Sequence, residues 1–126
     1  MKKKIIVAGH ICVDITPAIQ GKIVNKIQEL LIPGKLIEVG NATVSTGGAV
    51  ANTGLAMKIL GANVSLMGKI GNDAFGEIVK NVLKKYDVEE ELPVSDTEAT
   101  SYTVVVAVPG IDRIFLHNPG ANNAFY

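Results

Sequence analysis

The sequence predicts an α/β fold, in which a partial, doubly wound parallel sheet carries helices on both of its faces. The continuous β-branched run Lys4–Gly9 is typical of a strand that is buried on both faces, and Asn63–Ile70 is expected to form another buried strand. A third observation is that these runs alternate with two helical stretches, about 49–60 and 74–86. Alternating strands and helices are the order from which parallel sheets are built.

The composition fits a single folded domain formed by all 126 residues. The chain is 48% hydrophobic and 19% charged, and its 12 basic and 12 acidic residues cancel. This balance provides no basic field for nucleic acid or for an anionic membrane surface, and no run approaches the ~20 apolar residues that span a bilayer. We therefore expect neither nucleic acid nor a membrane as a partner.

The single cysteine, Cys12, cannot form an internal disulfide, and this usage fits the reducing cytoplasm. The two histidines, His10 and His117, are far apart in the chain and show no metal-ligand spacing. We interpret each histidine as a hydrogen-bonding residue of the core or of a pocket, and we expect no metal site.

The first strand ends at Gly9 and leads the chain to Asp14. Proline and glycine punctuate residues 17–34, so no long element is predicted there. Two short strands, Lys35–Val39 and Ala42–Thr46, are expected next, and the second of them delivers the chain to a pair of glycines.

This pair, Gly47-Gly48, opens the helix about 49–60. Glycine lets the backbone adopt unusual conformations and lets other groups approach it closely. The pair is either a binding loop at the helix start or clearance for tight packing on a sheet, and this stretch alone favours neither. The helix is apolar nearly all round, so we expect it to be covered on most sides, with Gly61 at its end.

The helix about 74–86 has the clearest periodicity, and Asp73 is placed to cap its start. Its apolar side chains fall on one stripe, formed by Phe75, Ile78, Val79, Val82, Leu83 and Tyr86. Three lysines lie off that stripe and predict a solvated face: Lys80, Lys84 and Lys85. A short strand is expected at Val88–Leu92.

Two β runs, Tyr102–Val108 and Ile114–His117, flank the turn 109–113 and predict a hairpin. We expect Arg113, at the hairpin tip, to be solvated rather than to contact a ligand. The order of strands and helices stops with the sheet half built, and such a sheet has unpaired edges and apolar faces. We therefore expect a homodimer or another form of self-association.

The polar groups placed to bind a ligand are Asp14, Asn52 and the backbone of Gly47-Gly48. Ligands of parallel α/β sheets bind beyond the carboxyl ends of strands, where these groups could face one crevice. A carboxylate, an amide and two backbone N–H groups suit sugar hydroxyls, which both donate and accept hydrogen bonds. The alternative is local: Asp14 caps a turn, and Asn52 bonds to nearby backbone.

Four motifs, in this order, resemble the ribokinase-like carbohydrate kinases of the phosphofructokinase-B type. They are Gly9-x4-Asp14, Gly47-Gly48-x3-Asn52, Gly71-Asn72-Asp73-Ala74-Phe75-Gly76 and Gly120-Ala121-Asn122. The resemblance covers the whole chain and implies a ribokinase-like α/β domain with a small β-sheet lid. It identifies residues 1–126 as the amino-terminal part of one kinase domain.

By this resemblance, Asp14 and Asn52 hold sugar hydroxyls, and Gly47-Gly48 gives backbone contacts. The lid is implied to come from three segments, at about 15–20, 35–46 and 102–117. Alternation along these strands places three side chains on one face: Thr103, Val105 and Leu116. We expect this face to cover the sugar and, when the lid closes, to exclude water.

Two departures from the ribokinase pattern concern the substrate. Residues 49–51 read Ala-Val-Ala, so the lysine and the third glycine of the family's G-G-K-G-A-N are absent. Cys12 stands where ribokinases tend to carry asparagine, so a contact to the sugar is lost or replaced by a weak thiol. Both departures put ribose in doubt and leave a related sugar or a nucleoside open.

The family's catalytic G-A-G-D motif has no counterpart in these 126 residues, and neither have its ATP and Mg²⁺ sites. The resemblance therefore implies an ATP- and Mg²⁺-dependent sugar or nucleoside kinase, of which this chain carries the sugar site and the lid. Two alternatives stay open: a non-catalytic sugar-binding module that works through a partner, and a self-associating fragment.

Overall fold

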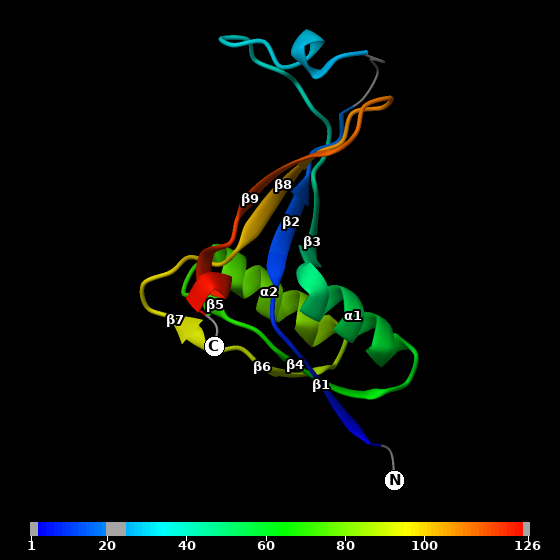
Figure 1. Ribbon diagram of the computed structural model, residues 1–126, viewed down its shortest axis with the longest axis vertical. Coiled ribbons are helices and arrows are strands. Elements are labelled where there is room, and N and C mark those ends of the chain that lie inside the picture. The colour runs from blue at the N-terminus through cyan, green and yellow to red at the C-terminus, as the bar shows by residue number, and fades with distance from the viewer. Residues whose placement is uncertain (1–2, 20–24, 125–126) are drawn as a thin grey trace.

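The computed structural model describes residues 3–19 and 25–124, which are arranged as Figure 1 shows. The strands and helices, in chain order, are β1 (Lys4–Ala8), β2 (Cys12–Thr16), β3 (Thr43–Gly47), α1 (Gly48–Ile59), β4 (Asn63–Met67), β5 (Ile70–Gly71), α2 (Ala74–Lys85), β6 (Glu89–Glu91), β7 (Val94–Ser95), β8 (Tyr102–Val106) and β9 (Ile114–Asn118). Two short 3₁₀ helices span Ile27–Glu29 and Gly120–Ala124. Among the described residues, no helix has the length and apolar character needed to cross a membrane.

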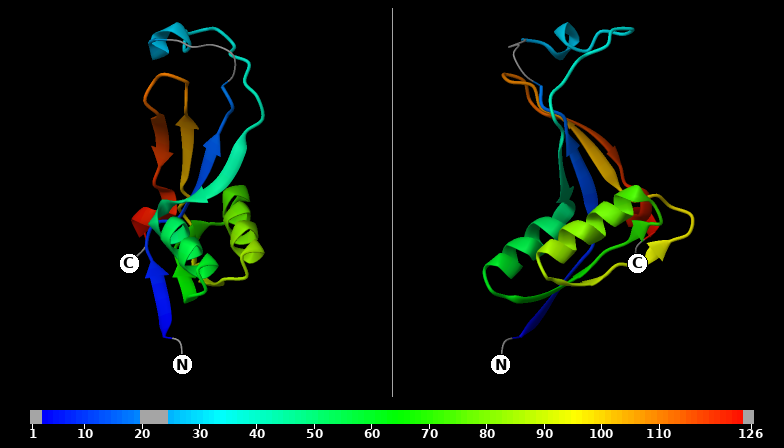
Figure 2. Two further views of the ribbon diagram at one scale, coloured as in Figure 1. Left: turned by 90° about the vertical axis from the view of Figure 1, so that its right-hand side faces the viewer. Right: turned by 180° about the vertical axis from the view of Figure 1, so that it is seen from behind.

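Three parallel strands, in the order β1-β4-β6, form the main sheet, and β5 and β7 form a separate short parallel pair. Both helices lie on the same side of the main sheet, as the two views of Figure 2 show. Because β1, β4 and β6 succeed one another in one direction, right-handed connections place α1 and α2 on one face. The predicted α/β architecture is confirmed, and the helical layer expected on the other face is not formed by the described residues.

The core lies between the main sheet and the two helices. Val50 of α1, Leu66 of β4, and Val79 and Leu83 of α2 are completely buried. Helix α1 approaches β4 closely because Gly54 faces Leu66, whose side chain occupies the space that a Cβ at Gly54 would need. The buried apolar residues of α2, Val79 and Leu83, belong to the predicted apolar stripe, which is confirmed except at its last member, Tyr86, which is 41% exposed.

Two expectations about burial are wrong. Strand β1 is not buried on both faces, since Ile6 is 59% exposed. Helix α1 is not covered on most sides, since Ile59 and Leu60 at its end are 70% and 86% exposed. In both places the apolar side chains point away from the core, toward sides that no described element covers.

Both predicted helix termini are confirmed. At the end of α1, Gly61 has φ +89°, its N–H donates to the Lys58 carbonyl, and the Ala62 N–H donates to the Met57 carbonyl. This bond pair is the Schellman motif, which glycine favours because it has no Cβ. At the start of α2, the Asp73 carboxylate accepts from the Gly76 N–H at 2.9 Å.

A second, four-stranded sheet in the order β3-β2-β8-β9 stands away from the α/β layer, and we call it the lid sheet (Figure 1). Strand β2 is antiparallel to β3 and parallel to β8, and β8 and β9 form the predicted antiparallel hairpin.

The boundaries of the lid sheet differ in part from those expected. The predicted strand Lys35–Val39 is wrong, because the residues 35–39 form no strand and the next strand begins only at Thr43. The first lid segment, expected at about 15–20, begins earlier, at Cys12, and its strand ends at Thr16. Position 20 lies outside the described residues.

Candidate functional site

A row of polar side chains crosses one face of the lid sheet. The register pairs Asp14 of β2 with Ser45 of β3 and with Thr103 of β8, and it pairs Thr103 with His117 of β9. Residues paired in this way point to the same face of a sheet. The four side chains therefore lie side by side, although they come from four strands.

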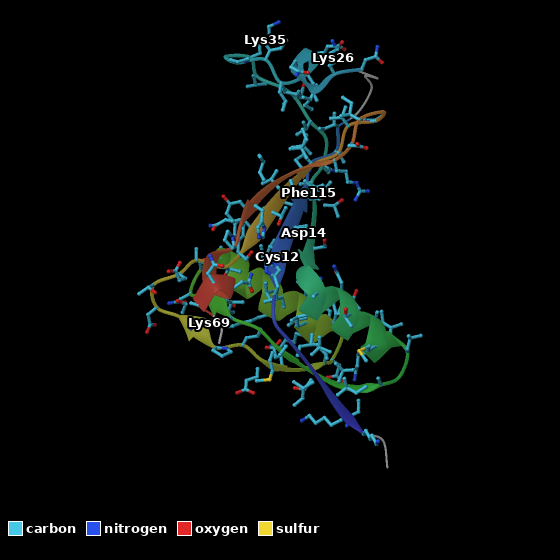
Figure 3. All side chains as sticks on the ribbon, viewed as in Figure 1. Cys12, Asp14, Lys26, Lys35, Lys69 and Phe115 are labelled. Atoms are coloured by element: carbon cyan, nitrogen blue, oxygen red, sulfur yellow. The ribbon has the colours of Figure 1, made fainter. Side chains whose placement is uncertain are left out.

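Asp14 lies directly against the glycine pair. A Cβ at Gly47 would collide with the Asp14 carboxylate, so no other residue type fits here without movement. The register also sets Gly47 opposite Cys12 in the β2–β3 ladder. The association of Asp14 with Gly47 that the sequence predicts is present, and Figure 3 shows Asp14 and Cys12 together on β2.

Cys12 is buried, and its thiol donates to Asp14 Oδ1 at 3.4 Å. Burial, followed by the charge of Asp14, raises the pKa of the Cys12 thiol to about 12, so the sulfur keeps its proton at neutral pH. Thr103 and the Gly47 backbone act in the opposite direction on this pKa but do not outweigh burial and Asp14. The thiol thus orients the Asp14 carboxylate, which is a different use from the direct sugar contact considered from the sequence.

Gly48 lies against His10, which precedes β2. Its φ is +87°, and a Cβ there would come within 2.6 Å of the His10 carbonyl oxygen and 2.7 Å of His10 Cδ2. The Val50 N–H, in the first turn of α1, donates to the same carbonyl at 3.1 Å. The start of α1 is therefore fixed to His10, which takes up one of the backbone donors that helix termini leave without partners.

Asn52 stands apart from these contacts. It is exposed on α1, and its side chain hydrogen bonds to no other described residue. The local backbone bond considered as its alternative role is absent from the described part of the chain, and its amide is open to solvent. The structure thus brings together Asp14, Gly47 and Cys12 directly, but it does not join Asn52 to them.

Two of the three predicted lid residues lie on the Asp14 face. Thr103 is paired with Asp14, and Val105, two residues further along β8, has the same orientation. The placement of Leu116 on this face is wrong, because Leu116 is paired with Val104 and points to the opposite face, where it is 57% exposed. Alternation shows which side chains of one strand share a face of the sheet. Which side chains of two neighbouring strands share a face depends on the register between the strands.

His117 occupies the place on β9 that the sequence pattern assigns to Leu116. Thr103 Oγ1 and His117 Nδ1 share a hydrogen bond of 2.8 Å. The His117 ring also lies 5.4 Å, centroid to centroid, from the His10 ring. No sequence pattern indicates this pairing beyond the two strands of the hairpin, since their register fixes which side chains are neighbours.

Asn122 has a role that the sequence did not reveal. Its Oδ1 accepts from the Ile11 N–H at 3.1 Å, and its Nδ2 donates to the Ile11 carbonyl at 3.0 Å. The third residue of the Gly120-Ala121-Asn122 motif therefore ties the segment after β9 to the β1–β2 connection, directly beside His10. This connection positions both β2 and the start of α1.

We call Cys12, Asp14, Gly47, Thr103 and His117 the Asp14 cluster. Its carboxylate forms no ion pair among the described residues. Two cavities, of about 310 and 280 Å³, lie elsewhere: one between α2 and β6, and one beside Phe75. Within the cluster, Cys12, Gly47 and Thr103 are buried, Asp14 is half-buried and His117 is exposed, so the cluster is open to solvent mainly at Asp14 and His117.

ATP and Mg²⁺ do not fit the Asp14 cluster. A nucleoside triphosphate requires cations or a phosphate loop, whereas this cluster offers a carboxylate. Residues 3–19 and 25–124 contain no group of three or more His, Cys, Asp or Glu side chains that could hold a metal ion. Hydroxyl-bearing ligands suit the cluster better, because carboxylate, hydroxyl, imidazole and backbone groups all exchange hydrogen bonds with them.

Comparison with known proteins places the chain in a family. Residues 2–126 match the profile of the pfkB family carbohydrate kinases. A fructokinase-2 of Zea mays is 30% identical over 117 residues, which cover 90% of this chain and 31% of that protein. The chain thus spans about a third of the length of this relative.

Solved structures share the fold. The ribokinase of Giardia lamblia superposes with a TM-score of 0.75 at 17% identity, over 93% of this chain and 36% of that one. A fructokinase of Xylella fastidiosa, solved with bound ATP, superposes with a TM-score of 0.68 at 23% identity, over 93% of this chain and 33% of that one. With the family match over nearly its whole length, the chain belongs to the pfkB family of carbohydrate kinases.

Proposed function

We propose that the chain is the sugar-binding part of an ATP-dependent carbohydrate or nucleoside kinase that phosphorylates a sugar hydroxyl. The observation that carries this proposal is the Asp14 carboxylate, which is held against the Gly47 backbone and oriented by the Cys12 thiol. Such a carboxylate is an acceptor for sugar O–H groups. The chain's membership of a carbohydrate kinase family supports the same function.

In this proposal the other groups of the site contact different parts of the sugar. In this proposal, Gly47 and Gly48 allow close backbone contact, and Thr103 and Asn52 exchange hydrogen bonds with hydroxyls. Val105 lies on the same face as Asp14 and is 7% exposed, so in this proposal it forms the apolar base of the surface beneath the sugar. A sugar has apolar C–H faces as well as hydroxyls, so a mixed surface of this kind is suitable.

We propose ATP with Mg²⁺ as the phosphoryl donor of the intact kinase, in keeping with the ATP found in the Xylella fastidiosa fructokinase. In this proposal other parts of the kinase bind these groups, since the Asp14 cluster does not fit them. The 126-residue chain should then bind sugar without transferring phosphate. ATP-dependent phosphorylation of a sugar by the purified chain would contradict this assignment.

We also propose that the chain self-associates and works in the cytoplasm. Exposed apolar side chains at Ile6, Ile59 and Leu60 support self-association, because their burial between two copies is favourable. A buried, protonated thiol at Cys12, with no second cysteine in the chain, suits a reducing compartment.

The test of the proposed function is calorimetric titration of the 126-residue chain with D-fructose, D-ribose and adenosine. The variant Asp14→Asn should weaken binding of the preferred ligand about 10-fold or more, since a hydrogen bond to a charged group contributes about 1.5–3 kcal/mol. Asp112→Asn is the matched control, because Asp112 is exposed in the hairpin loop, and it should bind as the parent does. Equal binding by both variants would refute the proposal.

A further inference from the structure

Two imidazole rings lie beside the Asp14 cluster and come from distant parts of the chain. His10 precedes β2, and His117 is on β9, yet their ring centroids are 5.4 Å apart with 42° between the ring planes. Each ring is held from a different side. The Thr103 hydroxyl bonds to His117 Nδ1 at 2.8 Å, while the His10 ring lies against Gly48.

We propose that His10 and His117 are sugar-binding residues, which together hold hydroxyl groups of an uncharged sugar next to Asp14. This inference rests on the proposed function, since it extends the same site. It adds two positions that neither the family motifs nor the alternation of the strands indicated.

The contacts leave one nitrogen of His117 and both nitrogens of His10 for a ligand. Within the described residues, His117 Nδ1 is bonded to Thr103, while no hydrogen bond involves His117 Nε2 or the His10 ring. The His117 side chain is exposed and that of His10 is half-buried, so both can be reached. A neutral imidazole offers one donor and one acceptor, which matches a hydroxyl group.

The charges around the pair favour an uncharged ligand. Burial, and then the nearby His117, lower the pKa of His10, and the charge of Asp14 opposes this only in part. The His10 imidazole is therefore neutral at neutral pH, and the nearby carboxylate repels anions. A phosphate or carboxylate group on the ligand would gain no fixed positive charge here.

Three neighbouring elements, β2, β8 and the start of α1, contribute groups beside the histidine pair. Strand β2 contributes Asp14 and the protonated Cys12 thiol, and β8 contributes the uncharged Thr103. The start of α1 contributes only glycine next to His10, with no acidic side chain in its first turn. Asp14 is therefore the one charged group of these elements that stabilises an imidazolium.

Binding should depend on pH in a definite direction. A sugar that covers the pair removes water from it, and desolvation disfavours the protonated imidazole. The pKa of His10 is then lower in the complex than in the free chain, so binding releases protons. The affinity for the sugar is highest above the pKa that His10 has in the free chain, and it declines as the pH falls through that pKa.

The experiment is calorimetric titration with D-fructose at about pH 7.5 and about pH 5.5, in two buffers of different ionisation enthalpy. The parent chain should bind about 3- to 10-fold more weakly at the lower pH, with a buffer-dependent heat that reports proton release. His10→Gln keeps a neutral donor and acceptor, so it should bind within about 3-fold of the parent at the higher pH and lose most of the pH and buffer dependence. His10→Leu and His117→Leu should lose about 10-fold or more at that pH.

Each outcome decides the proposal. If D-fructose binds to the parent but the histidine variants keep its affinity and its pH profile, the inference is overturned and the proposed function stands. If D-fructose 6-phosphate binds more tightly than D-fructose at the higher pH, the assignment to an uncharged sugar is overturned. If the parent binds none of D-fructose, D-ribose and adenosine, the inference and the proposed function are both overturned. If the leucine variants do not fold, the pH profile and buffer heats of His10→Gln decide alone.

Discussion

At Gly47, the backbone lies in close contact with the side-chain carboxylate of Asp14. The Asp14 carboxylate occupies the space that a Cβ at this position would need. The same carboxylate accepts a hydrogen bond from the Cys12 thiol. Burial raises the pKa of this thiol, so the thiol keeps its proton. The orientation of Asp14 therefore depends both on the lack of a side chain at Gly47 and on the hydrogen bond from Cys12.

The variant Gly47→Ala tests this dependence. The added methyl group must displace the carboxylate, so we expect sugar binding to fall about 10-fold or more, and the free energy of unfolding to fall by about 1–3 kcal/mol from overpacking. Calorimetry and urea unfolding measure the two effects. Gly34→Ala is the control, because Gly34 has φ +81° but no neighbouring atom within 4 Å of the place that an added methyl group would take. This control should lose stability through backbone strain while binding sugar normally. Unchanged sugar binding by Gly47→Ala would contradict the contact.

At the scale of single elements, α2 shows how a motif residue can be structural. Asp73 accepts from the Gly76 N–H and the Thr100 N–H, each at 2.9 Å, and from the Thr100 hydroxyl at 2.6 Å. A Cβ at Gly71 would come within 2.5 Å of the Glu98 carbonyl oxygen. This part of the motif therefore joins α2 to the segment before β8.

Asp73 also predicts a stability change in acid. Burial opposes its charge, but the hydrogen bonds from Thr100 and Gly76 outweigh burial, and the pKa of Asp73 is lowered. Since the folded chain holds the carboxylate in its charged form, this stabilisation is complete above the ordinary pKa of 3.8 and is lost as the pH falls through the lower folded value. Asp73→Ala should cost about 0.5–2 kcal/mol of unfolding free energy at about pH 7. Urea unfolding should show a smaller cost at about pH 3. An equal cost at both pH values would be the contrary result.

The elements that could be predicted from sequence are those fixed by local interactions. Helix α2 has its cap and its apolar stripe within a few residues of one another, and the 102–117 hairpin has strong β runs around one turn. The predicted strand Lys35–Val39 failed because alternation shows only that a segment suits a sheet. A strand also needs a partner, and the described chain gives this segment none.

The candidate site was predicted only in part for the same reason. Asp14 and Gly47 were found because the family motifs contain them, and the structure brings them into contact. Leu116 was placed on the wrong face, and His117, which was expected to form hydrogen bonds in the core or in a pocket, was not placed beside Asp14. The reason is that the register across the β8–β9 hairpin is not encoded in either strand alone. Asn52 was predicted as a sugar-binding residue from its motif. Its side-chain amide is exposed and hydrogen bonds to no other described residue.

For the whole molecule, the uncovered sides of the α/β layer are the surfaces that we propose for self-association. Ile6 of β1 and Ile59 and Leu60 at the end of α1 are exposed apolar side chains on elements of this layer. Monomers gain about 25 cal/mol for each Å² of apolar surface that they bury against one another. We propose that these surfaces mediate the self-association expected from the sequence.

Sedimentation velocity over a range of concentrations measures this self-association. The parent chain should show a concentration-dependent dimer or larger species, and Leu60→Lys should move the distribution toward the monomer, because a buried lysine is costly to desolvate. Asn72→Lys, at a position that is already polar and exposed, is the control and should sediment as the parent does. A parent that is monomeric throughout would show that the exposed side chains do not mediate association.

The location of the sugar is the central claim, and amide chemical shifts measured during titration with the preferred sugar test it most directly. We predict that the shift changes concentrate on the Asp14 cluster and its neighbour Gly48, with α2 and β6 unaffected. Shift changes confined to the cavity between α2 and β6, which Glu77, Lys80 and Asn81 line, would contradict this location. So would a spectrum that does not change at saturating sugar.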